Sequence, residues 1–147
     1  MRHALVLAAL LAVLPASAEE RATTQQAEFL VHKAVELIRK EGKPKAFAAF
    51  NDPNGPFMYR DLYIVAYDLD GMMRAHRTKE HVGKIRWDVK DPDGKYVVRE
   101  GVALAKAKGK GWIDYRYKNP ATGELEHKVA YVELVDGTVV TCGAYRP

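Results

Sequence analysis

The sequence predicts an α+β fold: a five-stranded antiparallel sheet with a long N-terminal helix on one face and a helical and loop insertion over the other. Residues Leu62–Asp68 alternate tyrosines with aliphatic side chains, as a half-buried strand does, and an Asp-Leu-Asp-Gly turn sends the chain back. A helix pattern precedes this hairpin, and an insertion and a three-strand meander follow it. Two strands before the insertion and three after it complete the sheet, and the helix covers its aliphatic face.

The hairpin of residues 59–76 has two different faces because side chains alternate along a strand. Its aliphatic face consists of Leu62, Ile64 and Ala66. Its other face consists of Tyr59, Asp61, Tyr63, Val65 and Tyr67. Gly71 supplies the positive φ of a tight reversal, and residues 72–76 return as the second strand. The aliphatic face needs a helix against it, whereas the face with phenols suits the lining of a small polar pocket.

The predicted N-terminal helix begins at Thr23 or Thr24, either of which can cap it, and runs to about Glu41. Its apolar positions have the spacing of one buried stripe and are Ala27, Leu30, Val31, Ala34 and Ile38. Gly42 ends this helix, and Pro44 starts a short second one. The Asn-Asp-Pro-Asn-Gly-Pro sequence that follows is a dense cluster of helix breakers and forms the loop into the first strand.

The chain after the hairpin divides into an insertion and three strands. Residues 77–94 form a long polar segment, which in a compact domain is usually functional or a lid. A modest helix over Tyr96–Lys108 follows and ends at glycines. The strands that complete the sheet are Gly111–Tyr117, Leu125–Val135 and Thr138–Tyr145, and an Asp-Gly pair joins the last two in a tight turn.

Residues 1–18 have the features of a secretory signal peptide. Arg2 precedes an apolar run that reaches Leu14, and Ala16-Ser-Ala18 provides the small residues of a cleavage site. The run is shorter than the roughly 20 residues of a membrane span; a retained anchor is the alternative. Cleavage would leave one domain, residues 19–147, in the periplasm or outside the cell. Its net charge would fall from +4 to +3, because Arg2 is the only charged residue removed.

Composition and residue spacing argue against several classes of function. Basic and acidic residues are interspersed, so the sequence lacks the basic patch of a nucleic-acid-binding protein. Cys142, the only cysteine, lies in an apolar strand pattern, which favours a buried structural thiol over a catalytic one. His76 and His81 have no further ligand at a recognisable metal-binding spacing, and no acid–base pair, nucleophile motif or phosphate loop is found. We therefore expect no catalytic residues, no metal and no cofactor.

Several motifs in a fixed order resemble the single Cache domain family. They span roughly Ala46–Tyr145 and read AFAAFNDPNGPF, DLYIVAYDLDGMMRAH, VGK, DPDGK, GKGWIDYRY, NPATGELEHKVAYV and CGAY. The resemblance implies a PAS-like extracytoplasmic sensor domain with a pocket in front of its sheet. Family members mostly bind small organic acids and are mostly the sensing parts of chemoreceptors and histidine kinases. This sequence shows no signalling segment, which indicates a stand-alone form, and it has Arg77 where the family's histidine motif commonly continues with proline.

The resemblance and the residue pattern together predict a ligand site. Lys128 lies inside an apolar strand and matches a family lysine, so we expect it to face a ligand carboxylate; the alternative is a lysine that reaches solvent at a strand edge. Two tyrosines match family tyrosines, and the histidine of the Ala-His pair also matches; ordinary packing is the alternative for each. The candidate ligand-binding residues are Lys128, Tyr63, His76, Trp112, Tyr115 and Tyr131.

Strand parity bears on four of these candidates. Trp112 and Tyr115 alternate on their strand, so one faces the pocket and the other joins the core. Lys128 and Tyr131 also face opposite sides of a regular strand. Both line one pocket only if that strand carries a bulge, so Lys128 ranks higher.

Three functions are compatible with this pattern. The first is an exported binding module that captures a small organic acid and presents it to a membrane-bound receptor or kinase. The second is an enzyme or redox accessory on the same fold. The third is an interaction module whose pocket is closed by its own side chains. We expect the first, and therefore no enzymatic activity, although a fold does not by itself fix a function.

Overall fold

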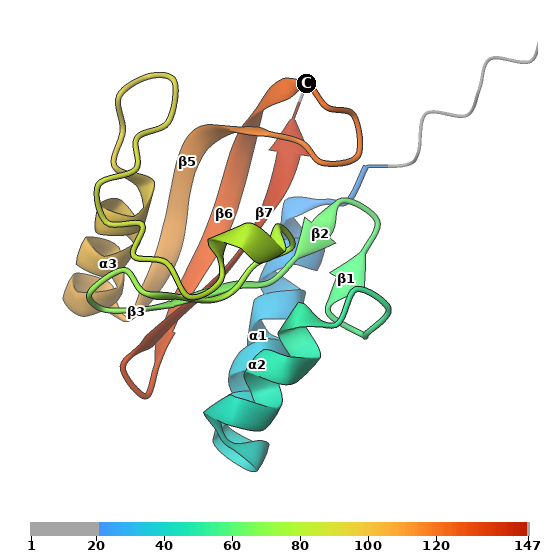
Figure 1. Ribbon diagram of the computed structural model, residues 1–147, viewed down its shortest axis with the longest axis vertical. Helices are drawn as coiled ribbons and strands as arrows, with labels where there is room; N and C mark the ends of the chain where they lie inside the picture. The colour runs from blue at the N-terminus through green and yellow to red at the C-terminus, as the bar shows by residue number, and fades with distance from the viewer. Residues whose placement is uncertain (1–20, 147) are drawn as a thin grey trace, which may run out of the picture.

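The computed structural model describes residues 21–146, so the predicted signal peptide lies outside the described residues. Helices lie on two sides of a curved sheet (Figure 1). The helices are α1 (Thr24–Glu41), α2 (Lys43–Asn51), the short 3-10 helix η1 (Lys79–His81) and α3 (Val97–Lys108). The strands are β1 (Met58–Tyr59), β2 (Leu62–Tyr63), β3 (Val65–Asp68), β4 (Met73–Ala75), β5 (Lys110–Lys118), β6 (Leu125–Val135) and β7 (Thr138–Arg146).

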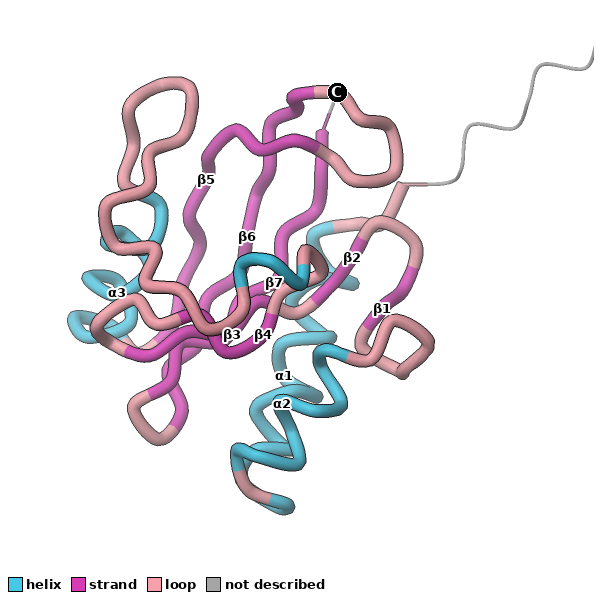
Figure 2. Tube along the Cα trace, in the orientation of Figure 1, coloured by secondary structure: helices cyan, strands magenta, loops and turns pink. Residues whose placement is uncertain are grey.

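Five strands form one antiparallel sheet in the order β4-β3-β7-β6-β5, which confirms the predicted architecture. The three long strands β5, β6 and β7 make up most of it (Figure 2). A tight turn at Asp136-Gly137 joins β6 to β7, where Val135 pairs with Thr138. From His127 to Glu133 the register of β6 with both neighbours advances one residue at a time. Side chains of β6 therefore alternate strictly between the two faces of the sheet.

The hairpin at residues 59–76 is less regular than its sequence predicts. The expected continuous strand is interrupted at Ile64, where the chain leaves a small two-stranded sheet with β1 and enters the ladder with β7. The alternation of faces survives this break, since Ile64 and Ala66 lie in the core toward α1 while Tyr63 and Val65 lie on the opposite side. Gly71 forms the turn with a φ of 89°. The strand pattern thus predicts the faces correctly but not the strand boundaries.

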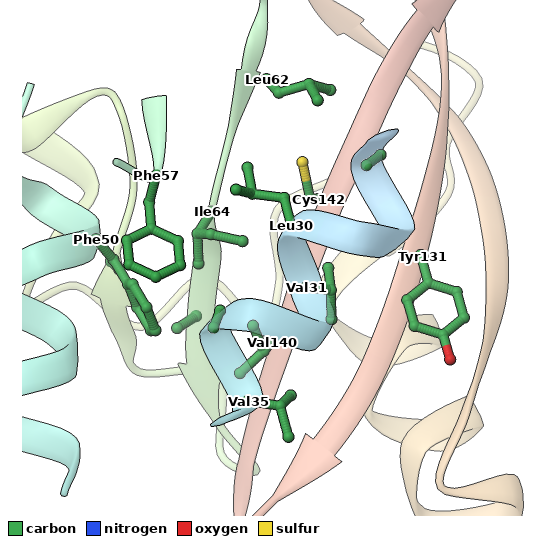
Figure 3. Packing of buried hydrophobic residues seen from close by; sticks show 14 of the residues in the cluster. Leu30, Val31, Val35, Phe50, Phe57, Leu62, Ile64, Tyr131, Val140 and Cys142 are labelled. Atoms are coloured by element: carbon green, nitrogen blue, oxygen red, sulfur yellow. The ribbon is translucent and has the colours of Figure 1, made fainter. Parts of the chain in front are cut away.

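One face of the sheet is covered by α1, which packs on β6 and β7. Thr23 caps this helix: its Oγ1 accepts from the Gln26 amide at 3.1 Å, and the Gln26 side chain accepts from the Thr23 amide at 2.9 Å. Aliphatic side chains of α1 meet those of the sheet and of the segment after α2 (Figure 3). Full burial of a valine, leucine or isoleucine side chain contributes about 1.5–3 kcal/mol. The apolar contacts between α1 and the sheet therefore stabilise the packing of the helix.

The opposite face is covered by α3 and by the insertion between β4 and α3, as the sequence predicts. Asp91 organises the insertion, because its Oδ1 accepts from the amides of Asp93 and Lys95. Its Oδ2 accepts from the Arg116 amide at 3.1 Å and so ties the loop to β5. Arg99 of α3 donates from Nε to the Trp87 carbonyl at 3.0 Å. These bonds hold the insertion against the sheet.

A bidentate ion pair ties the start of α1 to the start of β6. The two terminal nitrogens of Arg21 lie 2.7 and 2.8 Å from the Glu126 carboxylate oxygens. This pair, together with a hydrogen bond from Asn119, lowers the pKa of Glu126 to about 2.

Within residues 21–146, no helix has the length and hydropathy required to span a membrane.

Candidate ligand-binding site

A cavity of about 70 Å³ lies between the α3 face of the sheet and the insertion. Its floor comes from β3, β6 and β7, its side from β5, and its cover from residues 86–91 and the start of α3. The lining residues are Tyr63, Val65, Tyr67, Met73, His76, Arg86, Val89, Lys90, Asp91, Val97, Val98, Ile113, Tyr115, Tyr117, Lys128 and Thr141. The cavity is small beside the roughly 300–1,000 Å³ of sites for drug-sized ligands, so it suits a molecule of a few heavy atoms.

Lys128 is the principal charge on the cavity floor. Its side chain is only 1% exposed, and Nζ donates to the Tyr63 hydroxyl at 3.1 Å. Nζ also lies 4.2 Å from the ring centroid of Tyr63 and 4.9 Å from that of Tyr145. An ammonium over aromatic faces gains roughly 0.5–2 kcal/mol, which offsets part of the cost of burying the charge.

The stem of Lys128 can lie flat on the sheet because residue 143 of the neighbouring strand is glycine. A Cβ on Gly143 would stand 2.6 Å from Cγ and 2.8 Å from Cδ of Lys128, and closer still to Cε. Carbon atoms in contact are normally about 3.5–4.0 Å apart. Gly143 is therefore required for the close approach that directs Lys128 toward Tyr63.

The buried ammonium of Lys128 has no carboxylate partner among the described residues, since none of their ion pairs involves it. Asp91 is a carboxylate in the lining, but its oxygens accept from three backbone amides. Arg86 and Lys90 add two further cations in the cover. The cavity is thus electropositive, and it suits a small anion.

The phenols around Lys128 are neutral hydrogen-bonding groups. The hydroxyls of Tyr63 and Tyr145 lie 3.0 Å apart. Burial raises the pKa of Tyr63 to about 12, and burial also raises the pKa of Tyr115 and of Tyr145. These tyrosines stay neutral, so they do not form an ion pair with Lys128 as phenolates would. Their hydroxyls can donate hydrogen bonds to an anion.

His76 is held neutral at the side of the cavity. Burial, and then the charges of Lys128, His81 and Arg86, lower the pKa of His76 to about 3. Its Nδ1 accepts from the Thr78 amide at 2.8 Å, so the ring proton of the neutral imidazole is on Nε2. His76 can therefore donate one hydrogen bond to a ligand without adding charge.

His81 connects the cover to β5. One ring nitrogen lies 3.1 Å from the hydroxyl of Tyr117, and the other lies 3.1 Å from a guanidinium nitrogen of Arg86. Within the part of the chain that the structure describes, no cluster of histidine, cysteine and acidic side chains could hold a metal ion.

Four of the six predicted site residues meet at this cavity: Lys128, Tyr63, His76 and Tyr115. The prediction that Tyr131 lines the same pocket is wrong, because β6 is regular and Tyr131 faces α1 with the core residues around Cys142 (Figure 3). The prediction for Trp112 is also wrong, because Trp112 lies on the same face of the sheet as Tyr131. Trp112 pairs with Tyr131 across the strands, its ring centroid is 5.1 Å from that of Tyr131, and it is 42% exposed.

Sequence reasoning also missed several residues that line the cavity or support Lys128. Tyr145 and Gly143 share a face of β7, and strand pairing alone could have placed them beside Lys128. Thr141 lies on the same face of that strand. Arg86 and Tyr117 had weaker signals, because the first lies in an aperiodic loop and the second needs the β5–β6 register to be known.

Comparison with known proteins agrees with this fold. The sensor histidine kinase MctS of Rhizobium johnstonii is 36% identical over 89 residues, which are 58% of this chain and 19% of the kinase. The chain therefore spans about a fifth of the length of this curated relative. A methyl-accepting chemotaxis protein structure from Vibrio parahaemolyticus superposes with a TM-score of 0.71 at 20% identity, over 82% of this chain and 86% of that one.

A second solved structure, a Cache chemosensory domain that recognises a carboxylic acid, has a TM-score of 0.66 and is 28% identical, over 84% of this chain and 88% of that chain. These relatives are a sensor histidine kinase and chemoreceptor proteins, and single Cache domains are extracytoplasmic. The family model described as Single Cache domain 2 matches residues 7–146. Because that match covers nearly the whole sequence, the chain belongs to the single Cache domain family.

Proposed function

We propose that this protein is an exported sensor-type domain that binds a small monocarboxylate and presents it to a membrane-bound receptor or kinase. The observation that carries the proposal is Lys128, a buried ammonium that has no carboxylate partner among residues 21–146. A bound carboxylate would supply the missing charge through a short, charge-assisted hydrogen bond. Tyr63 and His76 offer neutral donors beside it.

The cavity volume of about 70 Å³ favours acids of two or three carbons. Such ligands gain at most about 1.5 kcal/mol per non-hydrogen atom, so five or six atoms limit the dissociation constant to about micromolar or weaker. The aliphatic lining from β3, β5 and α3 suits a short hydrocarbon tail. The ligand is thus expected to be acetate, propionate, lactate, pyruvate or a close relative.

Export and presentation rest on different observations. Removal of residues 1–18 by signal peptidase would release the domain into the periplasm or outside the cell. A receptor or kinase as partner is supported by the relatives, in which a similar domain belongs to a sensor kinase or a chemotaxis protein. An interaction module with a closed cavity is the competing function. An enzyme is disfavoured because the one carboxylate that residues 21–146 contribute to the lining, Asp91, accepts hydrogen bonds from backbone amides.

A thermal-shift experiment with sodium acetate, propionate, pyruvate and lactate at millimolar concentration tests the proposal, with sodium chloride at equal ionic strength as the reference. A ligand at a hundred times its dissociation constant stabilises the folded state by about 2.7 kcal/mol, so at least one acid should raise the melting temperature by several degrees. Lys128→Met keeps the length of the stem and removes the charge, so the variant should fold and lose the shift. Lys106→Met, at an exposed position on α3, should keep it.

Each possible failure has a distinct meaning. If no acid shifts the wild-type protein, acid binding is wrong and the closed interaction module is favoured. If Lys128→Met responds as the wild type does, the acid binds elsewhere and the site assignment is wrong.

A further inference from the structure

Thr141 is one of the residues that line the cavity floor, and its buried hydroxyl has no hydrogen-bond partner within residues 21–146. The residue lies on β7 between Val65 of β3 and Val132 of β6, and it is 4% exposed. Both cross-strand neighbours are thus valines, and a valine at position 141 would fill the same space without a polar atom. A buried hydroxyl that lacks a partner costs about 1–3 kcal/mol of desolvation. Its presence on the floor of a cavity points to a partner that enters the cavity.

The other buried polar side-chain atoms without partners in the described region do not line this cavity. They are Oγ1 of Thr138 and Oε2 of Glu133, which makes no hydrogen bond but lies 3.2 Å from Nδ1 of His32. Thr138 is the first residue of β7 and is fully buried. It pairs with Asp68 of β3 and Val135 of β6. It therefore serves as a matched control: an unpaired threonine hydroxyl on the same strand, away from the site.

Thr141 lies next to Lys128 along the floor. The stem of Lys128 crosses Gly143, and Gly143 and Thr141 are successive same-face residues of β7, about 7 Å apart along the strand. A three-carbon acid whose carboxylate is held by Lys128 would extend its C2 substituent over this part of the floor.

We infer that Thr141 is a specificity-determining residue that selects acids with a hydroxyl or keto oxygen at C2 over unsubstituted acids. This inference rests on the proposed binding of a monocarboxylate beside Lys128. A threonine hydroxyl both donates and accepts, so it can pair with the hydroxyl of a 2-hydroxy acid or with the oxygen of a 2-oxo acid. An unsubstituted acid such as propionate leaves the hydroxyl unpaired, and sites that hydrogen-bond a ligand oxygen discriminate against ligands that lack it.

Calorimetric titration of L-lactate, pyruvate and propionate into the wild-type protein and variants tests the inference. Wild-type protein should bind lactate or pyruvate about tenfold more tightly than propionate. Thr141→Val should remove most of this preference, by weakening lactate and pyruvate and not propionate, and its ligand-free melting temperature should equal or exceed that of the wild type. Thr141→Ser keeps the hydroxyl and should keep the preference. Thr138→Val should leave the preference unchanged.

Two outcomes overturn the inference without touching the proposed function. One is that the acids bind but the wild type does not prefer 2-substituted acids. The other is that Thr141→Val, and Thr141→Ala as a second variant without the hydroxyl, retain the wild-type ratio of affinities. If no acid binds the wild type, the proposed function itself fails, and the inference fails with it.

Discussion

Replacing Gly143 with alanine tests whether the position of Lys128 depends on the bare backbone beneath it. The new methyl group would stand 2.6 Å from Cγ and 2.8 Å from Cδ of Lys128, which is about 1 Å inside normal carbon–carbon contact. Both strands that hold these residues are central to the sheet, so the backbone has little freedom to yield. The lysine stem must move instead, and its ammonium leaves the Tyr63 hydroxyl.

Two effects of opposite sign determine how much Gly143→Ala changes the free energy of unfolding. Alanine restricts the unfolded chain more than glycine does and stabilises the folded state by about 0.4–1 kcal/mol where the native conformation allows it. Overpacking a well-filled site costs about 1–3 kcal/mol. The clash should win, with a net loss of about 1–2 kcal/mol in the free energy of unfolding and a fall of roughly 3–10 °C in melting temperature. Loss of the charge-assisted contact should weaken acid binding by roughly 10–100-fold.

A double-mutant cycle measured by thermal and urea denaturation isolates the contact. In a Lys128→Ala background the stem is absent, so Gly143→Ala should be neutral or stabilising. The same destabilisation in both backgrounds would show that the clash lies elsewhere. Wild-type stability and wild-type acid affinity in the single Gly143→Ala variant would refute the reasoning about the lysine.

The remaining predictions concern pH and export. Since the pKa of His76 falls from 6.5 to about 3 on folding, the unfolded state binds the extra proton between these values, and the free energy of unfolding should decrease as pH falls from about 6.5 toward 3. His76→Gln should flatten this slope above pH 4.5 in urea titrations, and an unchanged slope would contradict the role of the histidine; the Arg21–Glu126 pair adds a separate loss only between about pH 4.5 and 2. The mature protein isolated from its native compartment should begin at Glu19 in mass spectrometry, whereas intact Met1–Ala18 on membrane-bound protein would indicate a retained anchor.

The order of elements and the faces of the strands could be predicted from the sequence because both depend on short-range patterns. Thr23 as a cap, the stripe on α1 and the alternation around Tyr63 need only the periods of a helix and a strand. The same parity placed Lys128 and Tyr131 on opposite faces. The structure follows it, and the inclusion of Tyr131 among the site residues failed because it required a bulge that a regular β6 does not contain.

The fold class, the two-faced sheet and the presence of a lysine where an apolar residue is expected can all be read from local sequence patterns. The side chains that surround this lysine cannot, because they come from segments far apart in the chain. Gly143 and Tyr145 come from the adjacent strand, Arg86 comes from a loop without periodicity, and Thr141 has valines as both of its cross-strand neighbours. A local pattern fixes the face on which a residue lies, whereas the site depends on strand register and loop packing between residues far apart in the chain.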